Sequence, residues 1–399
     1  MVAGEDYGTT TPAASERENP TVDPPIGGRC DSRFHGVHAA FVENFASRGE
    51  VGAAVCVVID GQPVVDLHGG WCDPDRTRPW SSETIVNFYS VGKAIVGLLL
   101  LQQIDRGSLD LDAPIASVWP EFGTGGKESA TVRQALCHQA GVPAISERLT
   151  NTDLVDWSRM CAAIAATPAW YEPGSRHVYH TNTYGHLVGE LVRRASTLMP
   201  GDALKRIAGE LGADVWFGVP TSEQSRCAEV VWGGSVLPDD FDPFTLDDVT
   251  QRMVMTGYLN PPGYSSKGVV NTAAWRSTQV PSTNGHGSAS GVARLYAALL
   301  EPNLLVSSEL LAEATRVQSA GHCPVLDDDV VFGLGFKPTT PRRPFGPNPR
   351  SFGHFGSGGA VGFADPDAGV AFGYVMNHVI PRWQSTRNRA LIDAVYSAL

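Results

Sequence analysis

The sequence is short of positive charge and of long apolar runs. It has 30 lysines and arginines against 42 aspartates and glutamates, a net charge of -12, and only five of its 399 residues are lysine. Without a basic run to bind phosphate groups, nucleic acid and anionic membrane surfaces are not expected partners. The longest strongly apolar run, residues 94–101, is far below the roughly 20 residues that span a bilayer. The first 20 residues lack a basic patch and an apolar core, so we expect no secretory signal and a cytoplasmic protein.

Several common site signatures are also absent. The seven cysteines are scattered and form no CxxC pair, which favours reduced thiols over a disulfide framework or a zinc site. The eleven histidines include no HExxH, so no metalloprotease site is indicated. No GxSxG occurs, which argues against the nucleophile elbow of the alpha/beta-hydrolases. We therefore predict neither a metal nor an organic cofactor.

The patterns that are present place strands at both ends of the chain and helices in the middle. Near the start, apolar spacing predicts a helix over 33–47, and strands over 51–59 and 63–69 flank Asp60-Gly61, a strong hairpin turn signal. The helical period then predicts helices over 84–107, 131–138, two within 153–194, and 281–300. Strand patterns return over 330–336, 351–355, 360–364 and 369–377, followed by a final helix over about 385–399.

Neither group of strands is large enough to be stable alone. We therefore predict an α+β fold in which one antiparallel sheet is assembled from both ends of the chain. The expected organisation is a polar N-terminal arm over 1–30 and a single domain over 31–399. Within that domain, 31–80 and about 325–399 form the sheet subdomain, and about 81–324 form a mainly helical inserted subdomain. The composition of 341–350, rich in proline and arginine, excludes a regular helix there.

The strongest chemical signal is a serine three residues before a lysine at the start of an apolar helix. Residues i and i+3 share a helix face, so the Lys93 amine can reach the Ser90 hydroxyl. A lysine can take the proton of a serine nucleophile if burial lowers its pKa. The structural alternative is that Ser90 caps the helix and Lys93 extends to solvent.

The context of Ser90 resembles the serine beta-lactamase and penicillin-binding protein superfamily. Residues 90–93 read SVGK, 107–114 read GSLDLDAP, and 131–143 read TVRQALCHQAGVP. The resemblance is best to the esterase-like branch, the family VIII carboxylesterases and related proteins, and it covers about residues 51–377. It implies a beta-lactamase-like fold and an acyl-enzyme on Ser90.

A second family motif contains a tyrosine with a polar residue two places on. In EPGSRHVYHTNTYG, residues 172–185, Tyr179 takes the tyrosine place and Thr181 the place where relatives have asparagine. A phenol beside an ammonium group ionises more easily, so Tyr179 is predicted as general base toward Ser90 and later as acid toward the leaving group. Tyr184 and His180 are alternatives for this role, and a packed core tyrosine is the structural one.

The third family motif, Lys-Thr-Gly on a strand, is replaced by His354-Phe355-Gly356. By resemblance, the backbone N–H groups of Ser357 and Ser90 would form the oxyanion hole; the structural alternative for the glycines around Ser357 is a tight turn. Losing the motif lysine removes a cation that would hold a substrate carboxylate, which favours uncharged esters. The residues predicted to bind substrate are His354, Phe355, Gly356, Thr181 and Trp170, the last as a wall of the acyl pocket.

These observations predict a carboxylesterase that acts on a small-molecule substrate, a short or compact acyl ester. Ser90, Lys93 and Tyr179 are the predicted catalytic residues. The alternatives are an amide or lactam hydrolase (a weak beta-lactamase or a D-amino-acid peptidase), an acyltransferase that uses an alcohol acceptor, and a non-catalytic binding module of the same fold. The sequence leaves a homo-oligomer open.

Overall fold

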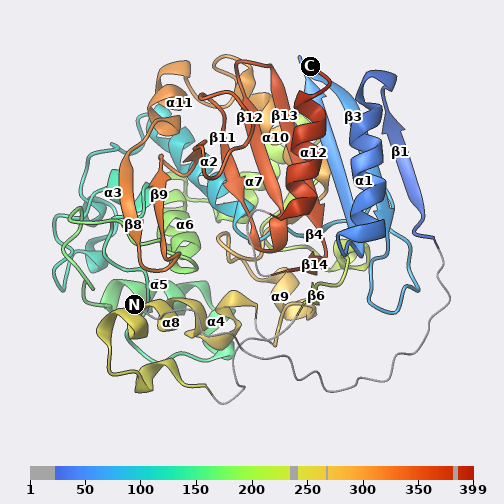
Figure 1. Ribbon diagram of the computed structural model, residues 1–399. Helices are drawn as coiled ribbons and strands as arrows, with labels where there is room; N and C mark the ends of the chain where they lie inside the picture. The colour runs from blue at the N-terminus through green and yellow to red at the C-terminus, as the bar shows by residue number, and fades with distance from the viewer. Residues whose placement is uncertain (1–22, 234–240, 267, 381–384) are drawn as a thin grey trace.

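The computed structural model describes residues 23–233, 241–266, 268–380 and 385–399. Its centre is a seven-stranded antiparallel sheet in the order β1-β3-β2-β13-β12-β11-β10. The blue strands from the beginning of the chain lie beside the red strands from its end (Figure 1). This arrangement confirms the prediction that one sheet is assembled from both ends of the chain. The strands of this sheet are β1 (Ile26–Cys30), β2 (Gly52–Ile59), β3 (Gln62–Gly70), β10 (Lys337–Pro338), β11 (Phe352–Phe355), β12 (Val361–Asp365) and β13 (Val370–Met376).

The hairpin between β2 and β3 turns where the sequence predicted. Asp60 and Gly61 both have positive φ, 49° and 74°, as expected for the two central residues of a type I′ turn. The hairpin is extended by β1, which pairs with β3 at the edge of the sheet. The residues of β1 were predicted to belong to the polar arm over 1–30, and the boundary at residue 30 is wrong because β1 is part of the sheet. The strand's sequence, IGGRC, carries little apolar alternation, so its pairing with β3 rather than its own pattern makes it a strand.

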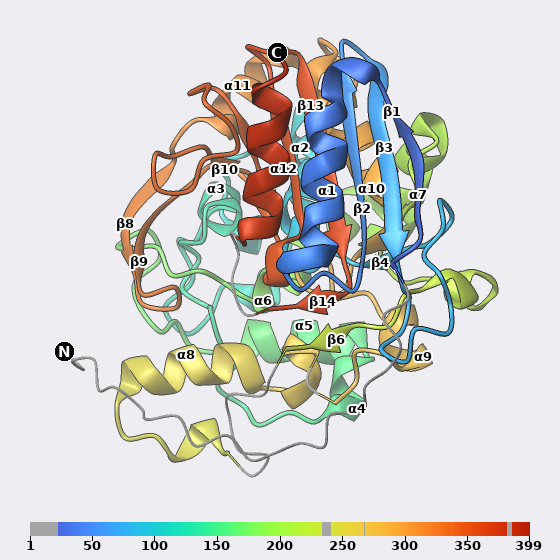
Figure 2. The ribbon, with the colours of Figure 1, turned by 45° about the vertical axis from the view of Figure 1, so that its right-hand side comes forward.

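Helices cover both faces of the sheet. Helices α1 and α12 lie side by side on one face (Figure 2), and α10 packs on the other face against β2, β12 and β13. The approach of α10 is close at Gly373, where an added β-carbon would lie 2.3 Å from the carbonyl oxygen of Ala289. The helices of the described residues are α1 (His35–Ser47), α2 (Val91–Asp105), α3 (Val132–Leu136), α4 (Asn151–Leu154), α5 (Trp157–Ala166), α6 (Thr183–Ser196), α7 (Pro200–Leu211), α8 (Val249–Leu259), α9 (Ala273–Ser277), α10 (Ala289–Leu300), α11 (Ser308–Thr315) and α12 (Thr386–Tyr396).

Helix α2 runs through the middle of the molecule. Its residues are buried on every side from Val91 to Gln103, because it packs against α6, α7 and β11 at once. A helix that is apolar all round is expected in such a position. The helix begins at Val91, seven residues later than the sequence predicted from residue 84. The reason is Tyr89, whose φ of 52° lies in the left-handed region and breaks the helical path just before Ser90.

Several shorter elements also differ from the sequence-based expectations. The helix predicted over 281–300 begins only at Ala289, and the strand predicted over 330–336 ends at Phe332, with Lys337 starting a separate strand. The structure also contains the following short strands, which lie outside the main sheet: β4 (Val86–Asn87), β5 (Val215–Trp216), β6 (Val231–Trp232), β7 (His286–Gly287), β8 (Ser319–Cys323), β9 (Asp328–Phe332) and β14 (His378–Val379). Within the described ranges, no helix is both long and apolar enough to cross a bilayer.

Candidate active site

Ser90 lies at the N-terminus of α2, partly exposed while its neighbours are buried. The left-handed conformation of Tyr89 turns the chain sharply at this point. Gly92 lets another segment approach, because a β-carbon at Gly92 would lie 2.1 Å from the carbonyl oxygen of Pro281. The next carbonyl, that of Ser282, accepts a hydrogen bond of 3.4 Å from the Ser90 hydroxyl. The serine is thus set at a tight junction between α2 and the 281–283 segment.

Lys93 is the side chain that contacts Ser90 most directly. Its Nζ lies 2.9 Å from Ser90 Oγ and 2.9 Å from the carbonyl oxygen of Ser282, and the residue is 0% exposed. Burial, and after it the charge of Lys337, hold the pKa of Lys93 well below its usual range. An uncharged amine in hydrogen-bond contact with a serine hydroxyl can accept its proton. The helix-face argument that paired these two residues from the sequence agrees with this geometry.

Tyr179 completes the group around Ser90. It is buried, and its side chain makes a hydrogen bond with Ser90 that partly offsets the increase in the phenol's pKa caused by burial. Lys93 Nζ lies 4.9 Å from the centre of the Tyr179 ring. Because burial has the larger effect, the phenol is protonated at neutral pH in the free protein, and Lys93 is the better proton acceptor of the two.

The two alternatives to Tyr179 are engaged elsewhere. The Tyr184 hydroxyl donates to the carbonyl oxygen of Leu136 at 3.2 Å. The His180 ring accepts from the backbone N–H of Val142 at 3.3 Å through Nε2, while Nδ1 lies 2.7 Å from the Val178 carbonyl oxygen. Burial lowers the pKa of His180 to about 4, so this imidazole is neutral. Both residues hold the surrounding backbone together.

Thr181 and Asn182 follow the predicted Tyr179 motif and make different contacts. Thr181 is partly buried, and its side chain makes a hydrogen bond with Tyr258. Asn182 is buried, and its Oδ1 accepts from Thr283 Oγ1 at 2.8 Å, while its own carbonyl accepts from the Ser282 hydroxyl. Asn182 therefore holds the segment whose Ser282 carbonyl binds Lys93. The sequence analysis did not identify Asn182.

The strand with the third motif passes directly beside the nucleophile. A β-carbon at Gly356 would lie 2.3 Å from the carbonyl oxygen of Phe88, so the backbone after β11 touches the backbone just before Ser90. Ser357 follows at the start of a short 3-10 turn, Ser357–Gly359. Neither its backbone N–H nor that of Ser90 has a hydrogen-bond acceptor within the described part of the chain. Two N–H groups without acceptors at adjoining turns are suited to an oxyanion.

The side chains of the third motif are less accessible than the sequence suggested. Phe355 is buried and stacks on Phe345 with ring centres 4.5 Å apart, and its contact with a substrate stays a prediction. His354 is also buried, with its ring 6.4 Å from that of Tyr179. Burial and the two nearby lysines hold the pKa of His354 well below its usual range. The position of the lysine in the Lys-Thr-Gly motif is thus occupied by a neutral imidazole that lies near the Tyr179 ring.

Trp170 is not brought to Ser90 by any contact among the described residues. Its indole N–H donates to the Ala144 carbonyl oxygen at 2.9 Å. It packs in a small apolar cluster with Tyr171, Val178 and Met253. The structure gives Trp170 a packing role in this cluster, and a part in an acyl pocket stays a prediction.

A buried lysine near Tyr179, in addition to Lys93, was not found from the sequence. Lys337 lies on β10 with 5% exposure, and its Nζ is 5.7 Å from the centre of the Tyr179 ring. Its position at the end of an apolar run gave no chemical signal. Ser282 was also missed, because it acts through its main-chain carbonyl, which leaves no side-chain signature. Among the described residues, no group of three or more histidine, cysteine or acidic side chains is placed to hold a metal ion.

Comparisons with known proteins place these features in a family. The family model described as Beta-lactamase matches residues 37–396. The chain is 31% identical over 395 residues to Esterase/beta-lactamase LipL of Mycobacterium tuberculosis, which covers 94% of this chain and 88% of that protein.

Two solved structures are also similar over most of their length. A family VIII carboxylesterase matches with a TM-score of 0.86 and 35% identity, covering 94% of this chain and 100% of that one. A penicillin-binding protein homolog from Caulobacter crescentus matches with a TM-score of 0.85 and 36% identity, with the same coverage.

Proposed function

The chain belongs to the beta-lactamase family, and we propose that within this family it is a serine carboxylesterase that hydrolyses small-molecule esters through an acyl-enzyme on Ser90. The observation that carries the proposal is the 2.9 Å contact between the buried Lys93 amine and the Ser90 hydroxyl. The names of the relatives, an esterase/beta-lactamase and a family VIII carboxylesterase, support the choice of an ester substrate.

Acylation begins with proton transfer from Ser90 to Lys93. Burial holds the pKa of Lys93 well below its usual range, and in its uncharged form the amine accepts the proton while Ser90 Oγ forms a bond to the ester carbonyl carbon. The C–O bond to the alcohol then breaks, and Tyr179 donates its phenolic proton to the departing oxygen. The Lys93 ammonium returns a proton to Tyr179, which restores both residues. Water repeats the sequence on the acyl-enzyme and releases the acid.

The negative charge of the tetrahedral intermediate is stabilised by the backbone. We assign the oxyanion hole to the N–H groups of Ser90 and Ser357. The contact between Gly356 and Phe88 supports this assignment because it holds the two turns against each other. Such fixed donors are most effective when no reorganisation accompanies the reaction. Each step uses groups of the chain itself, and the proposal includes no metal or organic cofactor.

An uncharged, compact ester suits the site better than an acidic or bulky substrate. The imidazole at His354, which burial keeps neutral, offers no cation for a substrate carboxylate. Ser90 is only partly exposed and is surrounded by the buried Lys93 and Tyr179, so we propose that the substrate has a short acyl group. Thr181, one of the less buried residues near Tyr179, and the backbone of Gly356 remain our proposed substrate contacts.

The experiment compares ester and lactam hydrolysis. We expect p-nitrophenyl acetate and butyrate to be hydrolysed with a higher kcat/KM than a chromogenic cephalosporin, and Ser90→Ala to abolish both reactions. Ser222→Ala, a change at an exposed serine, is the control. A higher kcat/KM for the cephalosporin would show that the protein is a lactamase and not an esterase. Added alcohols that divert product to a new ester would indicate an acyltransferase, and an unchanged rate in Ser90→Ala would remove the catalytic assignment.

We also propose that the enzyme acts in the cytoplasm. All seven cysteines are free thiols, six of them buried. Free thiols in this number are typical of a reducing compartment.

A further inference from the structure

Lys337 brings a second buried amine to the catalytic group. It is paired with Gly353 across β10 and β11, so it lies on the strand next to the one that carries His354. Its Nζ is 4.5 Å from the centre of the Phe332 ring and 5.7 Å from that of Tyr179. Lys93 Nζ lies 4.9 Å from the same Tyr179 ring. Two of the five lysines in the chain, Lys93 and Lys337, therefore have their amines close to the Tyr179 ring.

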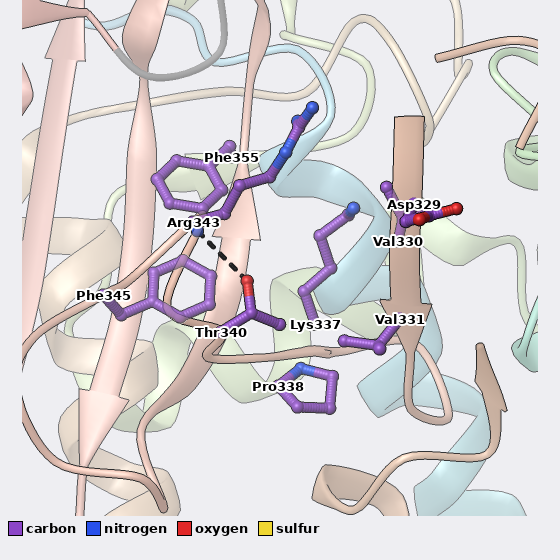
Figure 3. Close-up of a pocket in the computed structure, with 9 residues that line it drawn as sticks. All are labelled: Asp329, Val330, Val331, Lys337, Pro338, Thr340, Arg343, Phe345 and Phe355. Carbon is purple, nitrogen blue, oxygen red and sulfur yellow. Dashed lines mark hydrogen bonds between the residues drawn. The ribbon is translucent and has the colours of Figure 1, made fainter. Parts of the chain in front are cut away.

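The space around Lys337 is too small for a substrate group. In Figure 3 its side chain extends between the strand that carries Asp329, Val330 and Val331 and the rings of Phe345 and Phe355. The cavity at this point measures about 20 Å³, close to the space of one water molecule. An ammonium group in such a place does not bind a substrate directly and acts on the site through its charge.

Lys337 lies among basic, acidic and titratable groups of several elements. The carboxylate of Asp328 on β9 binds both Arg342 and Arg343. The titratable and charged groups that interact electrostatically with Lys337, from β8, β9, β11, α2 and the connecting loops, are Cys323, Asp328, Arg343, Lys93, His138, His177 and His354. The histidines among them are buried or partly buried, and each has a pKa below its ordinary value.

We propose that Lys337 is a positioning residue that supplies, from β10, the positive charge missing from the His354-Phe355-Gly356 motif, and that this charge favours the uncharged form of Lys93. A like charge nearby makes protonation of Lys93 more costly. The inference rests on the proposed function, since it takes Lys93 as the base. It goes further by assigning a role to a residue outside the three family motifs.

The pH range of this effect follows from Lys337 itself. Burial lowers the pKa of Lys337 to about 7, so its charge is present below neutral pH and lost above it. Below neutral pH, a proton on Lys93 would place two ammonium groups beside one ring. Lys337 therefore keeps Lys93 uncharged where a lone lysine would be protonated, and extends activity toward acid pH.

The test removes the charge and keeps the shape. We expect Lys337→Met to raise the pH of the acid limb of kcat/KM by about one unit, a tenfold loss on the acid side, with little change at the alkaline plateau. Lys337→Arg, which keeps a charge at every pH, should return the acid limb of kcat/KM to its wild-type pH. Lys205→Met, at an exposed helix position, is the control. An equal loss at every pH, without a shift, would show a structural role and overturn the proposal.

A second measurement decides the inference without any turnover. With five lysines in the chain, ¹³Cε-lysine labelling gives few enough signals to follow Lys93, identified by its loss in Lys93→Met. Its titration midpoint should rise by about one unit in Lys337→Met. An unchanged midpoint in a folded variant would overturn the inference, even if Lys337→Arg fails to fold. If the wild type hydrolyses no ester, the proposed function fails, but this midpoint still reports the coupling.

Discussion

Gly356 and Phe88 touch through their backbones, and the contact joins the two turns that carry the proposed oxyanion hole. A β-carbon at Gly356 would lie 2.3 Å from the Phe88 carbonyl oxygen, a distance that side-chain carbons do not reach without a shift of the main chain. Phe88 lies two residues before the nucleophile, and Ser357 follows Gly356. A displacement of either turn therefore changes the distance between the two N–H donors.

Gly356→Ala should consequently reduce catalysis more than it reduces binding. We expect kcat to fall by roughly 10²–10³-fold, the range seen when one oxyanion donor is lost, while KM changes little. The measurement is steady-state kinetics with p-nitrophenyl acetate. Gly209→Ala is the matched control, because that glycine is exposed on α7 and has open space around it. Equal kcat values for Gly356→Ala and wild type would show that the turn does not set the donor geometry.

Lys93→Met should be inactive and yet more stable than the wild type at neutral pH. Loss of the general base should cost roughly 10²–10⁴-fold in kcat, while replacing a buried amine by an apolar chain removes a desolvation cost. The folded-state pKa of Lys93 lies below its unfolded value, so the unfolded chain binds more protons below about 10.4. Wild-type stability therefore rises with pH in this window.

The gain from Lys93→Met should accordingly be largest at acid pH and vanish as the pH approaches about 10.4. Thermal melting across pH 5 to 10 tests this. A stability difference that is constant with pH would mean that Lys93 is not held uncharged by the fold.

Tyr179→Phe and Tyr184→Phe form a matched pair of variants. Tyr179→Phe removes the hydroxyl that bonds Ser90, and we expect kcat to fall by roughly 10²–10⁴-fold with the fold intact. Tyr184→Phe removes the hydrogen bond to the Leu136 carbonyl. It should lower the free energy of unfolding by about 1 kcal/mol and leave kcat near the wild-type value. The opposite pattern would transfer the catalytic role to Tyr184.

Asn182→Ala should affect both stability and activity. The side chain accepts from Thr283 Oγ1 and donates to the Gly257 carbonyl oxygen at 2.8 Å each, so its loss leaves buried groups without partners at a cost of about 1–3 kcal/mol for each. Because the 281–283 segment supplies the carbonyl that holds Lys93, kcat should fall as well. Thr181→Ala, on the neighbouring side chain, tests whether a substrate contact exists: it should raise KM and spare the melting temperature.

The sequence predicted the local part of the site and little of its long-range part. Ser90 and Lys93 could be paired because residues separated by three positions lie on the same face of a helix. Tyr179 was predicted from its motif, and the strand beside Ser90 was predicted from the motif that ends in the glycines after Phe355. Lys337 could not be found this way, since only the pairing of β10 with β11 brings it to Tyr179.

The fold shows the same division between local and tertiary information. The β2–β3 hairpin was predicted by its Asp60-Gly61 turn, whereas β1 lacks a strand pattern and exists through its pairing with β3. The start of α2 was predicted too early, because Ile85, Val86 and Phe88 extend the apolar pattern while the left-handed Tyr89 breaks the helix. The stacking of Phe355 on Phe345 could not be predicted either, because the two residues meet only in the folded chain.

Intact mass after brief exposure to a fluorophosphonate shows whether Ser90 is the nucleophile. We expect a single covalent adduct on the wild type that maps to Ser90 and is absent from a folded Ser90→Ala variant. No adduct on folded wild-type protein, or an adduct on another serine that persists in Ser90→Ala, would contradict it.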